Sequence, residues 1–203
     1  MKIICVGRNY ADHIAELANE RPDEPVIFTK PDTALLRNNE DFYYPAYTQD
    51  IHHEIELVVR ICKEGKYIDA EFADRYYDQL ALGIDFTARD LQNKAKAKGL
   101  PWAIAKGFNG SAPLSDFVSV TQFKDIQQLS FRLDVNGITK QTGHTRDMLW
   151  RVSELVAYIS QFFTLKVGDL IFTGTPQGVG PVQIEDRLEG YLEGQKMLDF
   201  VVK

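Results

Sequence analysis

The segment from Ile51 to Cys62 constrains the fold more than any other part of the chain, because apolar and polar side chains alternate along it. The apolar side chains at its odd-numbered positions are Ile51, Ile55, Leu57, Val59 and Ile61. Successive side chains of a β-strand point to opposite faces, so this pattern predicts one strand with an apolar face buried against a core. That face fixes the register and places Glu54 and Glu56 together on the other side.

Shorter patterns along the rest of the chain predict more strands than helices. Further strands are expected over residues 1–6, 26–30, 80–84, 129–135, 138–142, 170–173 and 197–202. Helices are expected over residues 9–19, 71–79, 87–99 and 151–163. Thr87 and Asp90 form the expected capping box of the third helix, and Asn136-Gly137 favours a tight hairpin turn. Since most strands are joined by hairpins without β-α-β alternation, we predict an α+β, mainly β architecture. No linker divides residues 1–203, so one domain is expected.

Net charge and hydrophobic patterning restrict the partners. The net charge is -6, whereas nucleic acids are bound by basic surfaces, so no nucleic-acid partner is expected. The short run Lys94, Lys96, Lys98 is expected to solvate a helix. No apolar run reaches the ~20 residues of a membrane-spanning helix, and no signal-peptide pattern precedes the first strand, which predicts a cytoplasmic protein without a membrane partner. Cys5 and Cys62 are expected to be buried free thiols.

Three acidic side chains form the strongest candidate site. Glu54 and Glu56 are two residues apart on the predicted strand, and Asp85 directly follows the buried strand 80–84. Like charges at this spacing repel one another unless solvent screens them or a cation lies between them. On the pattern alone, a solvated strand face is the simpler interpretation of the two glutamates, and the third carboxylate favours a cation. An all-carboxylate site suits a hard ion, so Mg²⁺ or Mn²⁺ is expected.

Other residues can supply acid–base and anion-binding chemistry. His13 and Glu16 are three apart on the first predicted helix, so the carboxylate can orient the imidazole as a general base. The alternative is an incidental pair on a solvated helix. Lys106 precedes Gly107 and either neutralises a substrate oxyanion at a pocket mouth or lies on the surface. The segment 173–181 offers hydroxyl and backbone N–H groups to a carboxylate, or forms only a tight turn.

These separate signals occur in one order along the chain. The motifs are Gly7-Arg8-Asn9-Tyr10 through His13 and Glu16, His52-x-Glu54-x-Glu56, Gly83 through Asp90 with Gln92, Gly99-Leu100-Pro101-Trp102 with Lys106, and Thr173 through Pro181. Together they resemble the fumarylacetoacetate hydrolase family over nearly the whole chain. The resemblance is closest to its acylpyruvate hydrolase and oxaloacetate decarboxylase subgroup.

The resemblance implies a structure and a set of site residues. The fold is expected to be a mixed β-sandwich roll of the family's C-terminal-domain type with a few peripheral helices, assembled as a homodimer. Positions matching the metal ligands are Glu54, Glu56 and Asp85, with Mg²⁺ or Mn²⁺ as the cofactor. Positions matching the catalytic residues are His13 and Glu16, on a segment that closes over substrate, and Lys106 beside the metal. Positions lining the substrate pocket are Arg8, Gln92 and Thr175.

The resemblance also implies a reaction on a small 2-oxo acid or β-diketo acid. The primary expectation is metal-dependent hydrolysis of the C–C bond of acylpyruvates, decarboxylation of oxaloacetate through a metal-stabilised enolate, or both. An alternative is isomerisation or tautomerisation of a 2-oxo diacid, of the 2-hydroxyhepta-2,4-diene-1,7-dioate isomerase or oxaloacetate tautomerase type. A second alternative is a non-catalytic module that binds a metal or a small acid. The presence of His13, Glu16 and Lys106 together argues against the module, because a binder has no use for a base.

Overall fold

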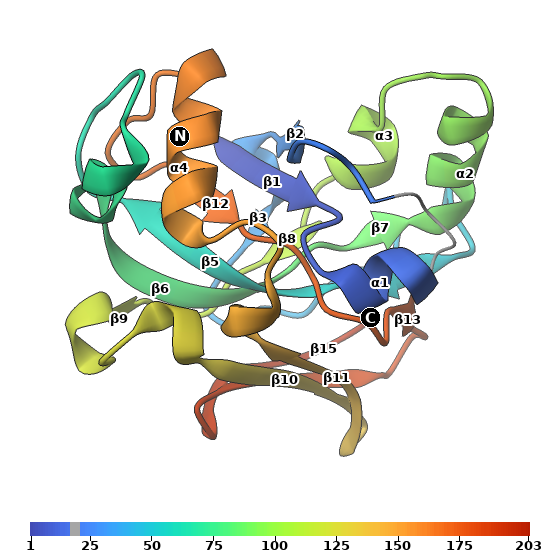
Figure 1. The fold of residues 1–203 in the computed structure, drawn as a ribbon. Coiled ribbons are helices and arrows are strands. Elements are labelled where there is room, and N and C mark those ends of the chain that lie inside the picture. Colours follow the sequence, from blue (N-terminus) through green and yellow to red (C-terminus); the bar gives the residue numbers. More distant parts are fainter. Residues whose placement is uncertain (17–20) are drawn as a thin grey trace.

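Two packed β-sheets form the frame of the molecule (Figure 1), and the computed structural model describes residues 1–16 and 21–203. The six-stranded sheet has the order β2-β1-β12-β5-β6-β9. Its strands are β1 (Ile3–Gly7), β2 (Val26–Lys30), β5 (Ile55–Ile61), β6 (Tyr77–Ile84), β9 (Val118–Ser119) and β12 (Leu170–Phe172). The four-stranded sheet has the order β11-β10-β14-β15. Its strands are β10 (Ser130–Val135), β11 (Ile138–His144), β14 (Arg187–Leu192) and β15 (Gln195–Val201). The four-stranded sheet packs against β5 and β6.

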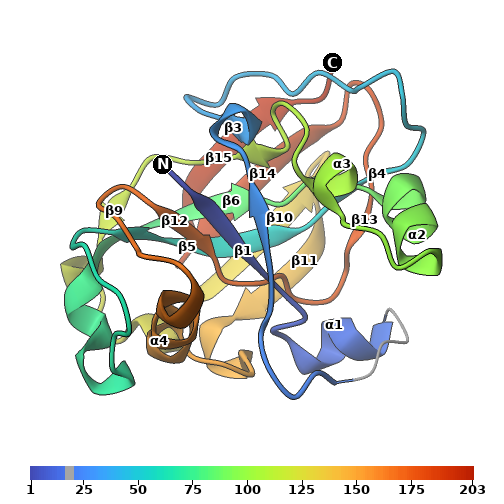
Figure 2. The same ribbon diagram turned by 90° about the horizontal axis from the view of Figure 1, so that it is seen from above.

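Short strands and helices surround this frame. Two small sheets pair β4 (Ile51–His53) with β7 (Thr87–Ala88) and β13 (Gly180–Pro181), and β3 (Leu35–Leu36) with β8 (Ala112–Pro113). The α-helices are α1 (Ala11–Glu16), α2 (Arg89–Ala97), α3 (Ala103–Lys106) and α4 (Val152–Phe162). The 3-10 segments are Asp32–Ala34, Ala70–Tyr76, Val120–Gln122, Ile126–Gln128 and Thr145–Asp147. In both ribbon views α2 and α3 lie side by side, away from α4 (Figure 2). The mainly β prediction with a few peripheral helices is therefore confirmed.

The six-stranded sheet is buried on both faces. One face, with Leu57 and Val59, joins the main core between the sheets. The other face, with Val58, Ala81 and Phe172, forms a smaller apolar cluster. Glu56 has the same strand parity as Val58, so it belongs to this second face. The polar side of the predicted strand is therefore buried, and the solvated-strand-face interpretation of the glutamates is wrong.

The long predicted strand over 51–62 is interrupted at Glu54, which separates β4 from β5. The break lets β4 leave the large sheet and pair with β7 and β13 instead. Around the predicted hairpin turn, Asn136 and Gly137 have φ values of 53° and 75°, as the sequence predicts. The helix predicted over 151–163 is confirmed as α4.

Other local predictions need correction. The helix predicted over 71–79 is the 3-10 segment Ala70–Tyr76, and β6 begins directly after it. The capping box is wrong because the Thr87 hydroxyl donates to Glu54 and the Asp90 carboxylate accepts from Thr48. Within the described residues the first helix begins at Ala11 and extends to Glu16, and its predicted continuation over 17–19 lies outside them.

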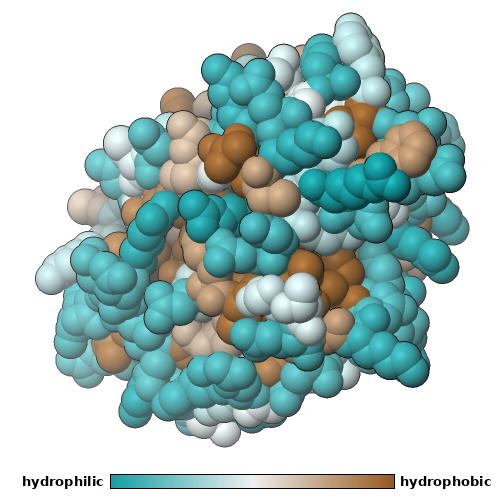
Figure 3. Space-filling view, turned by 90° about the vertical axis from the view of Figure 1, so that its left-hand side faces the viewer, coloured by the Kyte–Doolittle hydropathy of each residue, from teal (hydrophilic) through white to brown (hydrophobic). Residues whose placement is uncertain are grey.

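Surface and thiol properties follow from this arrangement. The side of the molecule that carries α4 is largely hydrophilic, with hydrophobic side chains gathered in patches near its centre (Figure 3). None of the helices in the described ranges combines the length and apolar character needed to cross a bilayer.

Cys5 is a buried free thiol and Cys62 a half-buried one. The free-thiol prediction therefore holds, and the burial of Cys62 is less complete than predicted.

Candidate active site

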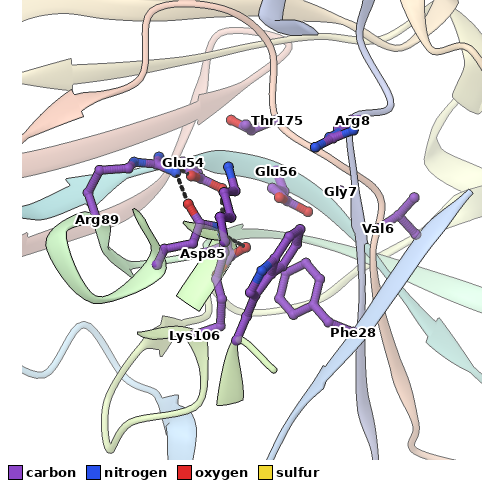
Figure 4. A pocket seen from close by; sticks show the side chains of 13 residues that line it. Val6, Gly7, Arg8, Phe28, Glu54, Glu56, Asp85, Arg89, Lys106 and Thr175 are labelled. Atoms are coloured by element: carbon purple, nitrogen blue, oxygen red, sulfur yellow. Dashed lines mark hydrogen bonds and ion pairs between the residues drawn. The ribbon is translucent and has the colours of Figure 1, made fainter. Parts of the chain in front are cut away.

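Three carboxylates meet where β5 begins and β6 ends. Glu56 lies opposite Gly83 in the β5–β6 ladder, and the backbone N–H of Asp85 donates to the carbonyl of Glu54 at 2.8 Å. One ligand atom from each of Glu54, Glu56 and Asp85 lies within 4.8 Å of the others. The residues are 5%, 2% and 1% exposed, and Figure 4 shows the side chains turned toward one another. The register of two strands therefore brings together acidic residues that are distant in sequence.

Cationic side chains neutralise this acidic cluster. The Lys106 ammonium donates to Glu54 Oε2 at 2.8 Å and to Asp85 Oδ2 at 2.6 Å. The Arg89 guanidinium donates to Glu54 Oε1 on the other side. Burial lowers the pKa of Lys106, but Asp85 and Glu54 outweigh it and the net pKa is raised. Lys106 is therefore a buried ammonium ion and not a surface side chain.

Lys30 is a second lysine whose ammonium contacts Asp85. Its ammonium lies 2.7 Å from Asp85 Oδ1 and donates to the carbonyls of Phe86, Ser111 and Lys106. These carbonyls belong to the segments that carry Asp85 and Lys106, so the Lys30 side chain joins the two segments. The sequence contains no signal for this role, because Lys30 reads only as the end of a strand before a proline.

Glu56 is the least compensated of the three carboxylates. Its Oε2 accepts a hydrogen bond from the backbone N–H of Gly174 at 2.7 Å. Burial raises the pKa of Glu56 well above its usual value, and the neighbouring Asp85 charge raises it further. A divalent cation beside Glu56 would favour the charged carboxylate and so lower its pKa. Carboxylate oxygens are the ligands that a hard ion prefers. The described residues thus fit a Mg²⁺ or Mn²⁺ site, which Glu54, Glu56 and Asp85 would form.

The cavity above the carboxylates has a free volume of about 40 Å³. Its lining includes all three side chains predicted to contact substrate, which are Arg8, Gln92 and Thr175. It also includes Val6, Gly7, Phe28, Arg89, Lys96 and Trp102, none of which the sequence identified as pocket residues. Figure 4 places Arg8 and Thr175 on the opposite side of the carboxylates from Lys106.

Part of this lining follows a simple helical pattern. Arg89, Gln92 and Lys96 have the spacing i, i+3, i+7 on α2, which places them on one helix face. All three line the cavity, and Lys96 is also exposed to solvent, so it solvates the helix as predicted and borders the cavity as well. The spacing was available in the sequence and could have identified this face once Gln92 was assigned to the pocket.

The segment predicted as an anion cradle mainly positions other groups. The Thr175 hydroxyl donates to the Ile55 carbonyl at 2.8 Å, which ties the segment to the start of β5. Gly174 has a φ of 104°, and a Cβ there would lie 2.6 Å from the Cβ of Asn9. Only glycine therefore allows the Gly174 N–H to approach Glu56 in this way.

Gln141 organises the same segment from β11. Its Oε1 accepts from the backbone N–H of Ile55 at 3.0 Å and lies 2.9 Å from His53 Nδ1. Its Nε2 donates to Thr175 Oγ1 and to the Pro176 carbonyl, both at 2.9 Å. Gln141 is 1% exposed, so one buried amide makes four polar contacts. No sequence motif pointed to it.

The predicted His13–Glu16 pair is described only in part. Both Glu16 oxygens accept from the backbone N–H of Gly178, at 3.0 and 3.2 Å, which brings α1 onto the segment that carries Thr175. The His13 side chain lies outside the described part of the structure. The dyad therefore stays a prediction.

Comparison with known proteins agrees with this geometry. A family model described as "Fumarylacetoacetate (FAA) hydrolase C-terminal" matches residues 2–202. The chain is 42% identical over 201 residues to "Oxaloacetate tautomerase FAHD1, mitochondrial" of Bos taurus, covering 99% of this chain and 91% of that protein. It is 45% identical over 183 residues to "Oxaloacetate decarboxylase, mitochondrial" of Dictyostelium discoideum, covering 90% and 84%. Among solved structures, fumarylpyruvate hydrolase of Pseudomonas aeruginosa in complex with Mn²⁺ and pyruvate matches with a TM-score of 0.95 and 38% identity, covering 100% of this chain and 89% of that one. These relatives are enzymes, and this chain belongs to the fumarylacetoacetate hydrolase family.

Proposed function

We propose that this protein is a divalent-metal-dependent enzyme that interconverts the keto and enol forms of a small 2-oxo diacid such as oxaloacetate, or decarboxylates it. The observation that carries the proposal is the convergence of Glu54, Glu56 and Asp85 within 4.8 Å at the base of a cavity with cationic walls. The likeness to proteins named oxaloacetate tautomerase and oxaloacetate decarboxylase supports the choice of substrate.

The charges around the cavity support a dianionic substrate. The cationic side chains that line the cavity are Arg8, Arg89, Lys96 and Lys106, and Lys30 contacts the lining residue Asp85. Among the residues that the structure describes at the cavity, these five cations exceed the three carboxylates by two before a divalent cation is added. A site with excess positive charge stabilises anions, and two carboxylates on one substrate match that excess.

Each side chain has a defined task in this proposal. Glu54, Glu56 and Asp85 would hold the cation, which when bound supplies Lewis-acid chemistry that acidifies the carbon next to a carbonyl. The Lys106 ammonium donates hydrogen bonds to the negative charge that develops on the substrate oxygen. Arg8, Gln92 and Thr175 orient the substrate from the walls.

Proton transfer is assigned to the first helix. His13 takes the proton from C3 of the keto form and delivers it to the enolate oxygen to give the enol, the reverse transfers restore the keto form, and Glu16 orients the imidazole. Phe28 and Trp102 form an apolar part of the wall and exclude water from the reacting carbon.

Hydrolysis of acylpyruvates is the second candidate, and the likeness to fumarylpyruvate hydrolase favours it. In that reaction His13 would remove a proton from water, which attacks the distal carbonyl, and the C–C bond would break to release an enolate. The same cavity and the same Lys106 serve both reactions, so substrate tests must separate them.

The deciding experiment follows purified protein with Mn²⁺ or Mg²⁺ by NMR in D₂O. Oxaloacetate reports C3 deuterium exchange and pyruvate formation, and acetylpyruvate reports hydrolysis. We expect metal-dependent exchange with oxaloacetate. If the metal-loaded protein accelerates none of these reactions, the proposed function is wrong.

A histidine variant tests the assigned base. His13→Ala should lower kcat by about 100-fold or more while the metal-induced rise in Tm is kept. Asp12→Ala, at an exposed residue of the same helix, should leave both unchanged. Normal turnover in His13→Ala would refute the base role.

The homodimer and the cytoplasmic location also belong to this proposal. Light scattering after size-exclusion chromatography should give twice the chain mass of 23.1 kDa. A monomeric mass would refute the dimer, and cell fractionation tests the compartment.

A further inference from the structure

One lysine of the cavity wall is not used by the proposed chemistry. Lys96 lies on the α2 face that also carries Arg89 and Gln92, and all three line the cavity. Lys94 and Lys98, on the same helix, line a separate surface hollow beside Leu100 and Ile104. The three lysines of this run therefore differ in position, and Lys96 alone among them faces the candidate active site.

Lys96 and Lys106 each lie next to an aromatic ring of the cavity wall. Its ammonium lies 5.5 Å from the ring centroid of Trp102, which packs edge-on against Phe28 at 5.9 Å. The Lys106 ammonium lies 5.0 Å from the ring of Phe28. The cavity wall thus carries two ammonium groups, of which Lys106 contacts the carboxylates and Lys96 contacts the ring of Trp102. A cation over an aromatic ring is held in position without being neutralised.

The electrostatic environment of Lys96 also differs from that of Lys106 and Arg89. Lys106 and Arg89 are paired with carboxylates, whereas among the described residues no carboxylate lies within ion-pair distance of Lys96. Burial lowers the pKa of Lys96, and the charges of Arg89 and Arg8 lower it further. Within the described part of the chain Lys96 therefore has no carboxylate in direct contact with its ammonium, and an anion placed at this point of the cavity wall would be attracted to it.

We propose that Lys96 binds the second carboxylate of a 2-oxo diacid, and that it makes the enzyme selective for diacids over 2-oxo acids with a neutral distal group. The inference rests on the proposed function, because it assumes that the 2-oxo acid end of the substrate lies at Glu54, Glu56 and Asp85. Lys96 lines the same cavity but is not among the cations paired with these carboxylates, so its ammonium is available to the other end of the same molecule. Trp102 acts as a positioning residue that holds the ammonium at the wall.

The test compares two substrates of one reaction. Oxaloacetate and 2-oxobutanoate both exchange C3 protons, and they differ in whether the distal group is a carboxylate or a methyl. Lys96→Met keeps the aliphatic length over Trp102 and removes the charge. We expect kcat/KM for oxaloacetate to fall about tenfold through KM, as for the loss of one partly exposed charge-assisted hydrogen bond. The value for 2-oxobutanoate should change less than about twofold.

Two further variants distinguish a specific contact from a general effect of charge. Lys96→Arg should restore most of the selectivity, and Lys94→Met, the same substitution on another face of α2, should have no effect. Equal losses for both substrates in Lys96→Met, or no loss for either, would overturn the inference.

Binding measurements separate failure of this inference from failure of the proposed function. Malate and 2-hydroxybutanoate are stable acids that differ in the same distal group, and calorimetry with the Mn²⁺-loaded protein gives their Kd values. Malate should bind about tenfold more weakly to Lys96→Met than to the wild type, whether or not the wild type turns over. An inactive wild type with this difference refutes the proposed function and keeps the inference. An active wild type without it refutes only the inference.

Discussion

The Glu56→Gln substitution tests whether the three buried carboxylates form a cation site or only a structural cluster of charges. In the metal-free protein, Glu56 is buried beside Asp85 and Glu54, and its pKa is raised by burial first and by these charges next. Glutamine has nearly the same shape, and its carbonyl oxygen can still accept from the Gly174 N–H, which now lies 2.7 Å from Oε2. We therefore expect Glu56→Gln to fold, to be at least as stable as the wild type in EDTA, and to lose the stabilisation by cations.

The size of the cation effect follows from ligand linkage. A ligand that binds only the folded state stabilises it by about 2.7 kcal/mol at a concentration of 100 times its Kd. In a chain of about 200 residues each kcal/mol raises Tm by roughly 2–4 °C. Mn²⁺ at that concentration should therefore raise the Tm of the wild type by about 5–10 °C. The Tm of Glu56→Gln should rise by less than about a third of that, because one of three anionic ligands is lost.

The pH dependence of the free energy of unfolding in EDTA tests the same reasoning independently. A carboxyl group whose pKa is higher in the folded than in the unfolded state does not destabilise the protein below the unfolded pKa, because it is protonated in both states. The free energy of unfolding decreases as pH rises from the unfolded toward the folded pKa. For Glu56 this window begins at the ordinary value of 4.5 and extends upward. The free energy of unfolding of the metal-free wild type should therefore equal that of Glu56→Gln near pH 4 and fall below it as pH increases.

Differential scanning calorimetry in EDTA and in Mn²⁺ measures both effects. Glu64→Gln, an exposed glutamate on the surface, is the matched control and should respond to Mn²⁺ like the wild type. The reasoning is refuted if Mn²⁺ raises the Tm of Glu56→Gln as much as that of the wild type. It is also refuted if Glu56→Gln is less stable than the wild type in EDTA at neutral pH, because the carboxylate would then be stabilising without a cation.

Three further substitutions test the packing and the surface charges. Gln141→Leu should lower the free energy of unfolding by about 3 kcal/mol in urea titrations, because its buried partners lose their hydrogen bonds; a loss below 1 kcal/mol would contradict this. Gly83→Ala should cost about 1–3 kcal/mol, because the added Cβ would lie 2.4 Å from the ring of Phe172; an unchanged urea midpoint would contradict it. Asp199 is paired with an arginine and a lysine that lower its pKa to about 2, so its contribution is present above pH 3.8 and is lost as pH falls through about 2. Because this network is exposed, Asp199→Asn should cost less than about 1 kcal/mol at pH 7, and a larger cost in the same titration would contradict the discount for solvent screening.

Periodic patterns over long segments predicted the fold well, and signals at the ends of helices and strands predicted it less well. The alternation over 51–62 located the central strand because burial selects for apolar side chains at every second position. It did not reveal the break at Glu54, because β4 and β5 keep the same alternation while pairing with different strands. The capping box failed since Thr87 and Asp90 have the right spacing, yet tertiary partners at Glu54 and Thr48 take their side chains.

The site was predictable where its residues lie in motifs, and not where they act through tertiary contacts. Motif matching placed Arg8, Gln92 and Thr175 at the cavity, and all three line it. Lys30 and Gln141 carry no local signal, because their hydrogen-bond partners are 56 or more and 34 or more residues away. A single sequence without a register between strands does not show which carbonyls or amides such side chains will meet.

The two buried lysines of the site differ in what holds them, and this difference decides which of them can respond to a cation. Lys30 donates mainly to backbone carbonyls, which the fold fixes, and it contacts only one carboxylate oxygen of Asp85. Lys106 is held by the carboxylates of Glu54 and Asp85 themselves, which are the groups that a cation would take. Breaking one partner of a buried ion pair is strongly unfavourable unless another charge replaces it, and a divalent cation is such a replacement. A bound cation would therefore leave the backbone partners of Lys30 unchanged, whereas the partners of Lys106 are two of the three residues that would hold the cation, so Lys106 is the lysine whose surroundings metal loading would alter.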